Sequence, residues 1–271
     1  MVSVASPHYF VSPDSVVRRI WGKADTILFI FAGAAAEFAL NKAVDWLYFT
    51  GRLPADPLGR LFSTVTYARQ IVFAEQVAAE RAIDTIAAIH AAVEAKRGMS
   101  IPAWAYRDVL FMLIDYSIRA FEALERPLTL PEKEEVFEVF TRVGQRMGIP
   151  DLPTSYATWL PVRAQHLADD MAPSRYTADL YHQYRRHLGP VRYHLLRHAQ
   201  GLVTPEPVRQ MLTLGSGAAL RPIIFVYRRV GDFALSQWAR VSLLPAAYRA
   251  QIAALDVNFS APVHLAVSTV H

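Results

Sequence analysis

Four long segments repeat their apolar residues with a period close to that of an α-helix. They span residues 57–73, 76–97, 103–123 and 131–147. Strand patterns are weak by comparison. The run PIIFVYR (222–228) is rich in β-branched and aromatic residues, but no second run joined to it by a turn would complete a hairpin. The sequence therefore predicts an all-α fold with about ten helices.

The chain is long and apolar enough to pack these helices around one large core. It has 271 residues, of which 53% are hydrophobic and 19% are charged. Neither an internal repeat nor a low-complexity tract nor an obvious linker divides it. We therefore expect residues 1–271 to form a single helical domain.

Helix starts are marked by residues that accept hydrogen bonds from the first backbone N–H groups. At one start, Thr129 and Glu132 have the spacing of a capping box, and at two others proline follows the capping residue. The predicted capping residues are Ser12 or Asp14 in SPDSVVRRIWG, Asp56 before Pro57, Thr129, and Thr204 in TPEP (204–207).

The segment ADTILFIFAGAAAEFALNKAV (24–44) approaches the length of a membrane span. Glu37 interrupts it, Lys42 and Asp45 close it, and no basic flank orients it. We predict a buried core helix, with contact to a membrane as the alternative. The first residues show no secretory signal, so we expect a cytoplasmic protein without a stable membrane span.

Charge and cysteine content exclude several classes of function. The formal net charge is +4 and is spread along the chain, so nucleic-acid binding is not expected. The most basic stretch, residues 181–198, is interpreted as a solvated helix face; His194 and His198 within it have a metal-capable spacing but lack a third ligand in sequence. The absence of cysteine excludes disulfides, thiol nucleophiles, iron–sulfur clusters and cysteine-bound zinc.

The segment ERAIDTIAAIHAAVEAKRG (80–98) places an imidazole in an apolar stripe. At helical spacing Ile83, Ile86, His90 and Val93 share one face. A histidine in this position is more often a core residue bonded to a carbonyl than a ligand. The pattern by itself leaves both interpretations open.

A second group of polar residues lies one predicted helix earlier. Arg60 and Thr64 are four residues apart and share a helical face. If the chain turns back near residues 73–77, Thr64 and His90 lie about 11 and about 15 residues from the turn, at nearly the same height. The three side chains could then line one cavity. Alternatively, Arg60 pairs with a carboxylate and Thr64 bonds back to its own helix.

These residues carry a resemblance to a known family. The chain resembles the MpaB-type and rubber-oxygenase (latex clearing protein) family over about residues 11–252. The segments that carry this resemblance are SPDSVVRRIWG, ADPLGRLFSTV, IAAIHAAV, RPLTLPEKEEVFEVFTRVGQRMGIP and LLPAAYRAQI. The resemblance implies a globin-like all-α fold with a buried pocket for haem b. It also implies that His90 is the iron ligand and that Arg60 and Thr64 lie close to the haem as binding and catalytic residues. Tyr106 and Tyr116 are further candidates to face the haem.

The chain departs from the family pattern at two phrases. Relatives carry a His-Pro pair where this chain has Asn41 and Lys42, and a Trp-containing phrase where it reads YRDVLFMLIDYS (106–117). The resemblance also implies an acid in the distal pocket that acts as a base. Glu37 and Asp45 lie in the corresponding region of this sequence.

The resemblance implies a haem b-dependent oxygenase-like enzyme that acts with O₂ on a hydrophobic substrate, of an isoprenoid or otherwise unsaturated kind. No C-x-x-C-H motif for covalent attachment exists, which agrees with haem b. Two alternatives remain open: a haem-binding protein that senses or carries rather than catalyses, and a haem-free helical interaction protein.

Overall fold

The computed structural model describes residues 8–51 and 56–230, with the side chains of residues 57, 58, 60–62 and 230 outside the description. Eleven α-helices and one short 3₁₀ helix (Ala218–Leu220) make up the secondary structure of these ranges, which contain no β-strand. The all-α prediction is therefore confirmed. The α-helices are α1 (Val16–Trp21), α2 (Ala24–Phe38), α3 (Val44–Phe49), α5 (Pro57–Phe73), α6 (Gln76–Arg97), α7 (Ala103–Leu124), α8 (Leu130–Arg146), α9 (Tyr156–Asp169), α10 (Arg175–Val203), α11 (Glu206–Met211) and α12 (Arg221–Val230).

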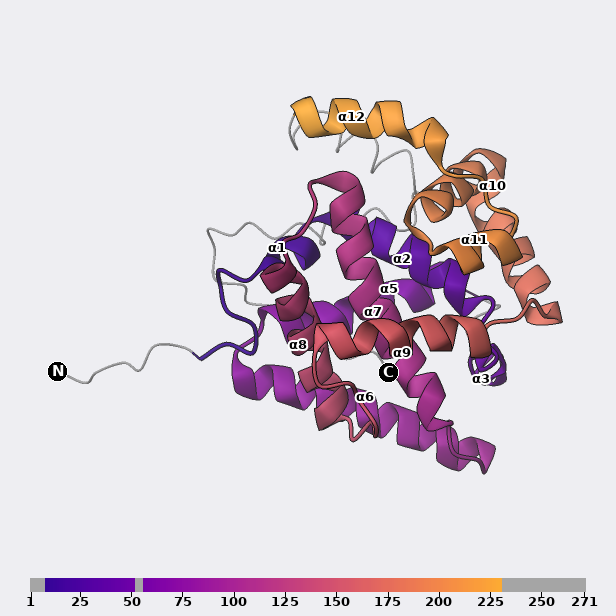
Figure 1. Cartoon of the computed structure of the whole chain (residues 1–271). Helices are drawn as coiled ribbons and strands as arrows, with labels where there is room; N and C mark the ends of the chain where they lie inside the picture. Colours follow the sequence, from indigo (N-terminus) through magenta and orange to yellow (C-terminus); the bar gives the residue numbers. More distant parts are fainter. Residues whose placement is uncertain (1–7, 52–55, 231–271) are drawn as a thin grey trace.

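Helices α2 and α7 pack against each other in the middle of the molecule (Figure 1). Both present fully buried aliphatic side chains, such as Ile27 and Ile114. They are in close contact at Gly33, where an added Cβ would lie 2.2 Å from Cδ1 of Tyr116. The apolar segment is thus a core helix, as predicted, although the helix ends at Phe38. Within the described ranges, no helix has the length and apolar character needed to cross a membrane.

The capping residues explain where several helices begin. Thr129 and Glu132 form the predicted capping box of α8, and the Asp56 side chain accepts a hydrogen bond from the N–H of Gly59 at 2.8 Å. Two cap predictions were wrong. Ser15, rather than Ser12 or Asp14, caps α1. Thr204 ends α10 instead of starting α11, because its hydroxyl donates to the carbonyl of Gln200 at 2.7 Å.

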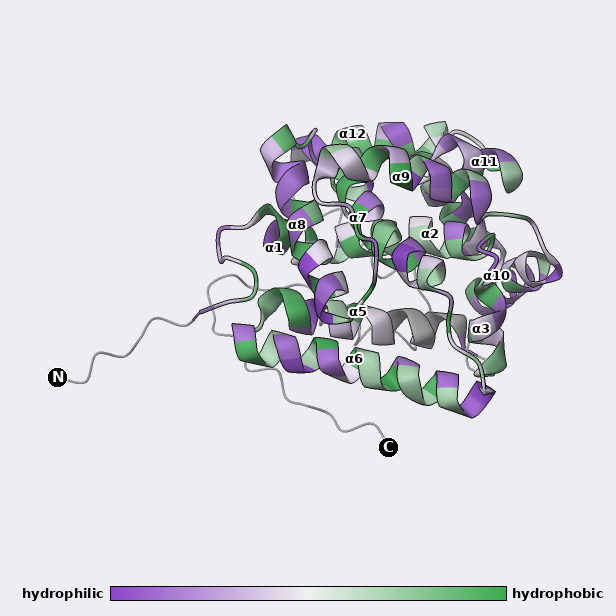
Figure 2. Cartoon of the chain, turned by 60° about the horizontal axis from the view of Figure 1, so that its bottom comes forward, coloured by the Kyte–Doolittle hydropathy of each residue, from purple (hydrophilic) through white to green (hydrophobic). Residues whose placement is uncertain are grey.

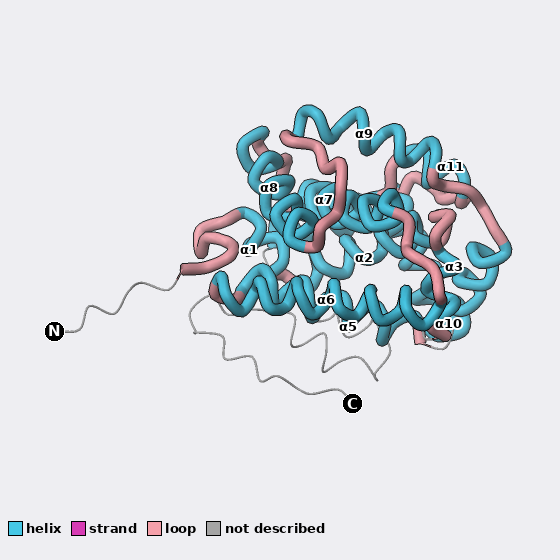
Figure 3. The backbone as a smooth tube through the Cα atoms, turned by 90° about the horizontal axis from the view of Figure 1, so that it is seen from below, coloured by secondary structure: helices cyan, strands magenta, loops and turns pink. Residues whose placement is uncertain are grey.

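Helices α5 and α6 form a hairpin at one edge of the molecule. Helix α5 ends at Phe73 and α6 begins at Gln76, so the chain reverses within the predicted 73–77 turn. The two helices lie side by side, with α6 on the outside (Figure 2, Figure 3). Only Ala79 and Ile83 of α6 are buried. The remainder of α6 is therefore only partly covered by the rest of the fold.

Helix α9 carries polar side chains into the core. Trp159, Arg163, His166 and Leu167 are its buried residues, and their spacing places them on one helical face. Ser155 and Thr158 form a capping box that fixes the start of the helix. Because this face packs toward the molecule's centre, a guanidinium and an imidazole become buried there.

Helix α10 bends at Gly189, which has a φ of 72° and is followed by Pro190. The basic stretch 181–198 therefore lies on a kinked helix. Nε2 of His194 and Nε2 of His198 are 2.9 Å apart in an exposed pair. Neither residue belongs to a group of three metal-ligating side chains among the described residues.

Candidate functional site

The α5–α6 hairpin fixes the relative heights of the predicted haem-site residues. Arg60 lies 13 residues before Phe73 and Thr64 nine residues before it, whereas His90 lies 14 residues after Gln76. At about 1.5 Å per residue, Arg60 is level with His90, and Thr64 is about 7 Å nearer the turn. Thr64 is half-buried on α5, and the side chain of Arg60 lies outside the described part of the structure. The shared cavity of the three residues stays a prediction.

His90 lies half-buried on α6, next to the start of α7. The ring of Tyr106 stands edge-on to the imidazole, with 5.3 Å between the ring centroids. The Tyr106 hydroxyl donates to Oε1 of Glu94 at 3.2 Å, and the same oxygen accepts the N–H of Ile101 at 2.7 Å. Burial and the negative charge of Glu94 raise the pKa of Tyr106 to about 12. Tyr106 therefore stays neutral and holds its ring against His90.

Aliphatic side chains surround His90 on the same helix. Ile86 and Val93, one turn to either side, are half-buried, and Ile89 is 44% exposed. An imidazole in the middle of a partly exposed aliphatic face is a donor that a large apolar ligand can reach. This arrangement differs from that of a core histidine enclosed on all sides.

Glu37, one of two candidate distal acids, is held in a buried network of charges. It is 0% exposed, and its two carboxylate oxygens each accept a hydrogen bond from Arg163 at 2.6 Å. The hydroxyl of Tyr116 also donates to Glu37, at 2.8 Å. Nε and Nη2 of Arg163 reach Oδ2 of Asp115 at 3.2 and 3.0 Å. The carboxylate of Glu37 is thus fully engaged.

The charges in this network support one another. Burial lowers the pKa of Arg163, but the carboxylates of Glu37 and Asp115 outweigh that effect and raise it above its ordinary value. Burial and the charge of Glu37 raise the pKa of Tyr116 well above its usual range. Tyr116 therefore acts as a neutral hydrogen-bond donor in the core, and we assign it no contact with a cofactor.

Asp45, the second candidate acid, lies on α3 and pairs with Nη2 of Arg97 at 2.6 Å. The guanidinium of Arg97 also stacks over the ring of Trp46, 3.9 Å from its centroid. This ion pair ties the end of α6 to α3. Both acids thus have cationic partners that the sequence pattern does not reveal.

A second polar cluster, here called the Asp108 cluster, consists of Asp108, His166 and Asp170. Nδ1 of His166 contacts Oδ1 of Asp108 directly and lies 3.6 Å from Oδ2 of Asp170. Nδ2 of Asn41 donates to Oδ2 of Asp108 at 2.6 Å. Burial, and next the charge of Asp108, raise the pKa of Asp170 above its ordinary value. The two segments that depart from the family pattern therefore contact each other in this cluster, through the hydrogen bond between Asn41 and Asp108.

The Asp108 cluster was not predicted from the sequence. Asp108 and His166 are 58 residues apart, so local spacing gives no sign of their contact. The available signal was the face of α9, on which Arg163 and His166 alternate with Trp159 and Leu167 at core positions. Polar residues at such positions imply buried partners elsewhere in the chain.

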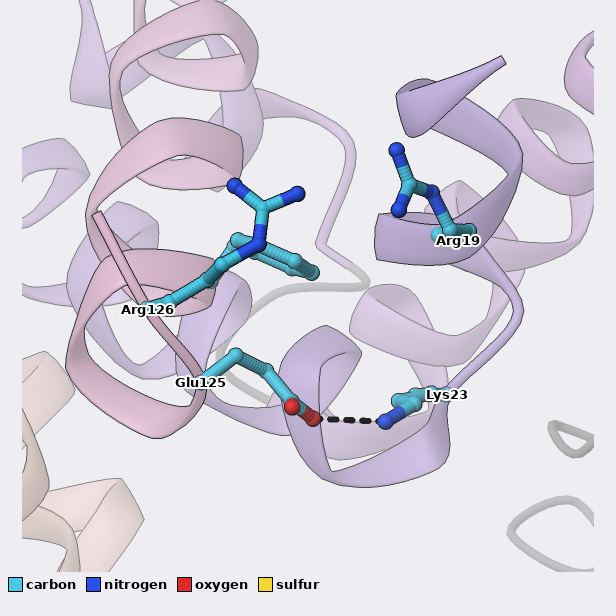
Figure 4. A pocket seen from close by; sticks show the side chains of 5 residues that line it. Arg19, Lys23, Glu125 and Arg126 are labelled. Carbon is cyan, nitrogen blue, oxygen red and sulfur yellow. Dashed lines mark hydrogen bonds and ion pairs between the residues drawn. The ribbon is translucent and has the colours of Figure 1, made fainter. Parts of the chain in front are cut away.

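A surface hollow of about 410 Å³ lies beside the end of α7 (Figure 4). Lys23 pairs with Glu125 at 2.6 Å, whereas Arg19 and Arg126 both reach Glu132, at 3.2 and 2.7 Å. Because its cations already have carboxylate partners, we assign no anion site to the hollow. The residues that line it are Arg19, Lys23, Phe121, Glu125 and Arg126.

Comparison with known proteins identifies the family. No curated protein and no solved structure matches the chain. Residues 18–252 match the family described as ER-bound oxygenase mpaB/B'/Rubber oxygenase, catalytic domain. This range covers most of the chain and agrees with the resemblance found over about residues 11–252. The chain therefore belongs to the mpaB and rubber oxygenase catalytic-domain family, a family of oxygenases.

Proposed function

We propose that the protein is a haem b-dependent oxygenase that acts with O₂ on a hydrophobic, unsaturated substrate. The observation that carries the proposal is the position of His90 in the α5–α6 hairpin. Its imidazole lies half-buried in an aliphatic helical face, in a chain that belongs to an oxygenase family. An imidazole nitrogen on an apolar wall is a group that could hold the iron of a haem.

The residues around His90 fit this role. Ile86, Ile89 and Val93 can cover an apolar disc and exclude water from its face, because each retains exposed surface. The Tyr106 ring, edge-on at 5.3 Å, restricts the orientation of the imidazole. We propose His90 as the residue that binds the iron, with Tyr106 beside it. When bound, the haem supplies the oxygen chemistry, while the protein supplies binding and orientation.

Helix α5 would form the facing wall. Arg60 is level with His90 along the hairpin, and Thr64 lies on the same face of α5, toward the turn. A guanidinium suits the two carboxylates of a haem, and a hydroxyl can donate to an oxygen atom of a reacting group. We propose these two roles for Arg60 and Thr64. We assign no proton transfer to Glu37 or Asp45, because both are held in ion pairs.

Oxygen uptake by haem-loaded protein tests the proposal. Purified full-length protein is loaded with haem b and supplied with short polyisoprenes or unsaturated lipids in an oxygen-electrode cell. We expect uptake with the wild type, and slower uptake at unchanged haem content in Thr64→Val. His194→Ala, in the exposed pair on α10, is the matched control and should behave as the wild type.

The same experiment separates the alternatives. A haem-loaded protein that shows no uptake with any of these compounds and does not bind CO would be a carrier or sensor with both axial positions filled. A protein that binds no haem would be a helical interaction protein. Either result would contradict the proposed function.

A further inference from the structure

The Asp108 cluster brings three side chains of metal-ligating type to one point. Ligand atoms of Asp108, His166 and Asp170 all lie within 4.8 Å of one another, and no second such group occurs in the ranges that the structure describes. We propose that this cluster binds a divalent transition-metal ion, with Zn²⁺ as the representative. The site is separate from the haem site and does not depend on the proposed function.

Helix α7 lies between the two sites. Tyr106, which contacts His90, and Asp108 are two residues apart on α7 and therefore point about 200° apart around the helix axis. Asp108 thus faces α9, while Tyr106 faces α6. A metal ion at the Asp108 cluster would not share a ligand with the iron at His90.

The three ligands combine burial with access. Asp108 is 0% exposed and His166 is 8% exposed, whereas the side chain of Asp170 keeps 19% of its surface. The cluster is therefore closed on the core side and reaches solvent at Asp170. Three protein ligands with one side toward solvent leave room for water to complete the coordination.

Neighbouring groups hold the ligands in place. Asn41 donates to Oδ2 of Asp108, which leaves Oδ1 directed at His166. The ring of Phe111 lies 5.1 Å from the imidazole, and the backbone N–H of Lys42 donates to the carbonyl of Asp170 at 2.9 Å. Hydrogen-bonded and packed partners of this kind orient ligands in metal sites and strengthen binding.

The charges of the cluster favour a divalent cation. A divalent ion would balance the charges of both carboxylates. The other charges that act on Asp170 are the ammonium of Lys42 and the carboxylate of Asp169, which shift its pKa in opposite directions. His166 also lies in the last turn of α9, where the carbonyl groups of the helix end attract a cation.

One imidazole and two carboxylates suit Zn²⁺ or Mn²⁺, whose bonds to nitrogen and oxygen are about 2.0–2.2 Å long. Ligand atoms at such distances from one ion lie farther apart than His166 and Asp108 do in their direct contact. Binding must therefore separate these two groups and place the ion between them.

Zn²⁺ titration tests the site. Full-length protein is stripped with EDTA and titrated with ZnCl₂ in competition with a chromophoric chelator. We expect one tightly bound equivalent, and an affinity at least about tenfold weaker in His166→Gln and in Asp170→Asn. His194→Ala/His198→Ala is the control and should keep this equivalent, because it changes only the exposed pair on α10. Circular dichroism confirms that each variant is folded.

X-ray absorption at the zinc edge decides the question on the wild type alone, should a variant fail to fold. One imidazole nitrogen with carboxylate oxygens at about 2.0–2.2 Å supports the proposal. Two imidazoles would place the ion outside the Asp108 cluster, which holds one histidine, and would overturn the proposal. Absence of stoichiometric binding, or equal affinity in folded His166→Gln, would also overturn it.

Discussion

The buried network around Arg163 gives the sharpest stability prediction. Arg163 is 4% exposed, and its guanidinium donates two hydrogen bonds to Glu37 at 2.6 Å and two to Asp115 at 3.2 and 3.0 Å. In Arg163→Met, Asp115 keeps its pair with Arg119 at 2.6 Å, but Glu37 keeps only the hydroxyl of Tyr116. We expect the free energy of unfolding to fall by about 3–5 kcal/mol, because a carboxylate is left buried without its cation.

Urea unfolding of cofactor-free protein measures this loss as a shift of the midpoint at unchanged slope. Arg19→Met is the control: Arg19 is 51% exposed in its pair with Glu132, and its removal should cost under about 1 kcal/mol. Adding Glu37→Gln to Arg163→Met should recover about 0.5–3 kcal/mol, since no unpaired charge then remains. If Arg163→Met lowers the free energy of unfolding no more than Arg19→Met does, the buried carboxylate does not need its cation. Strict additivity of the effects of Arg163→Met and Glu37→Gln in the double variant would lead to the same conclusion.

Two further predictions concern packing and pH. Gly33→Ala should lower the free energy of unfolding by about 1–3 kcal/mol, because its Cβ would lie 2.2 Å from the ring of Tyr116. Gly215→Ala is the control in the same urea assay and should be nearly neutral, because no neighbouring atom lies within 4 Å of its Cβ. Equal effects of the two substitutions would show that the contact with Tyr116 is not what costs stability. The hydrogen bond from Arg126 lowers the pKa of Glu132 from 4.5 to about 2. Glu132 therefore stabilises the fold above about pH 4.5 and loses that contribution as the pH falls toward 2. Urea midpoints should drop more steeply across this window for the wild type than for Glu132→Gln; parallel curves would show that the carboxylate contributes nothing.

Helix positions were predictable because they depend on local pattern. The segments 57–73 and 76–97 coincide with α5 and α6. Their apolar periodicity and their helix-terminal residues, such as Asp56 and Gly98, involve only residues that are close together in the sequence. Individual caps were less secure. Ser12, Asp14 and Ser15 can all accept backbone hydrogen bonds, and the choice among them depends on how the preceding chain packs.

The strand-like run 222–228 lies in α12. Without a partner strand its β-branched residues form no ladder, and tertiary contacts decide its conformation. Nη2 of Arg228 donates to the carbonyls of Glu122 and Ala123 at 2.9 and 2.7 Å, which attaches α12 to the end of α7. Contacts between residues so far apart in the sequence cannot be predicted from the local pattern.

The site was only partly predictable for the same reason. His90 stood out because a polar residue interrupts an apolar face, and the hairpin followed from helix lengths. The partner of Glu37 is Arg163, 126 residues away, and the Asp108 cluster draws on two separate parts of the chain, α7 and the end of α9. Long-range polar contacts of this kind arise from packing, so sequence spacing identified the acids but not what holds them.

The most direct test of the central claim is the Soret absorbance of full-length protein purified from haem-replete cells. We expect a Soret band in the wild type that is lost or shifted in His90→Ala and unchanged in His194→Ala, because His90 is proposed to bind the iron. Wild-type protein without a Soret band, or a band that His90→Ala leaves unchanged, would show that His90 does not bind a haem iron.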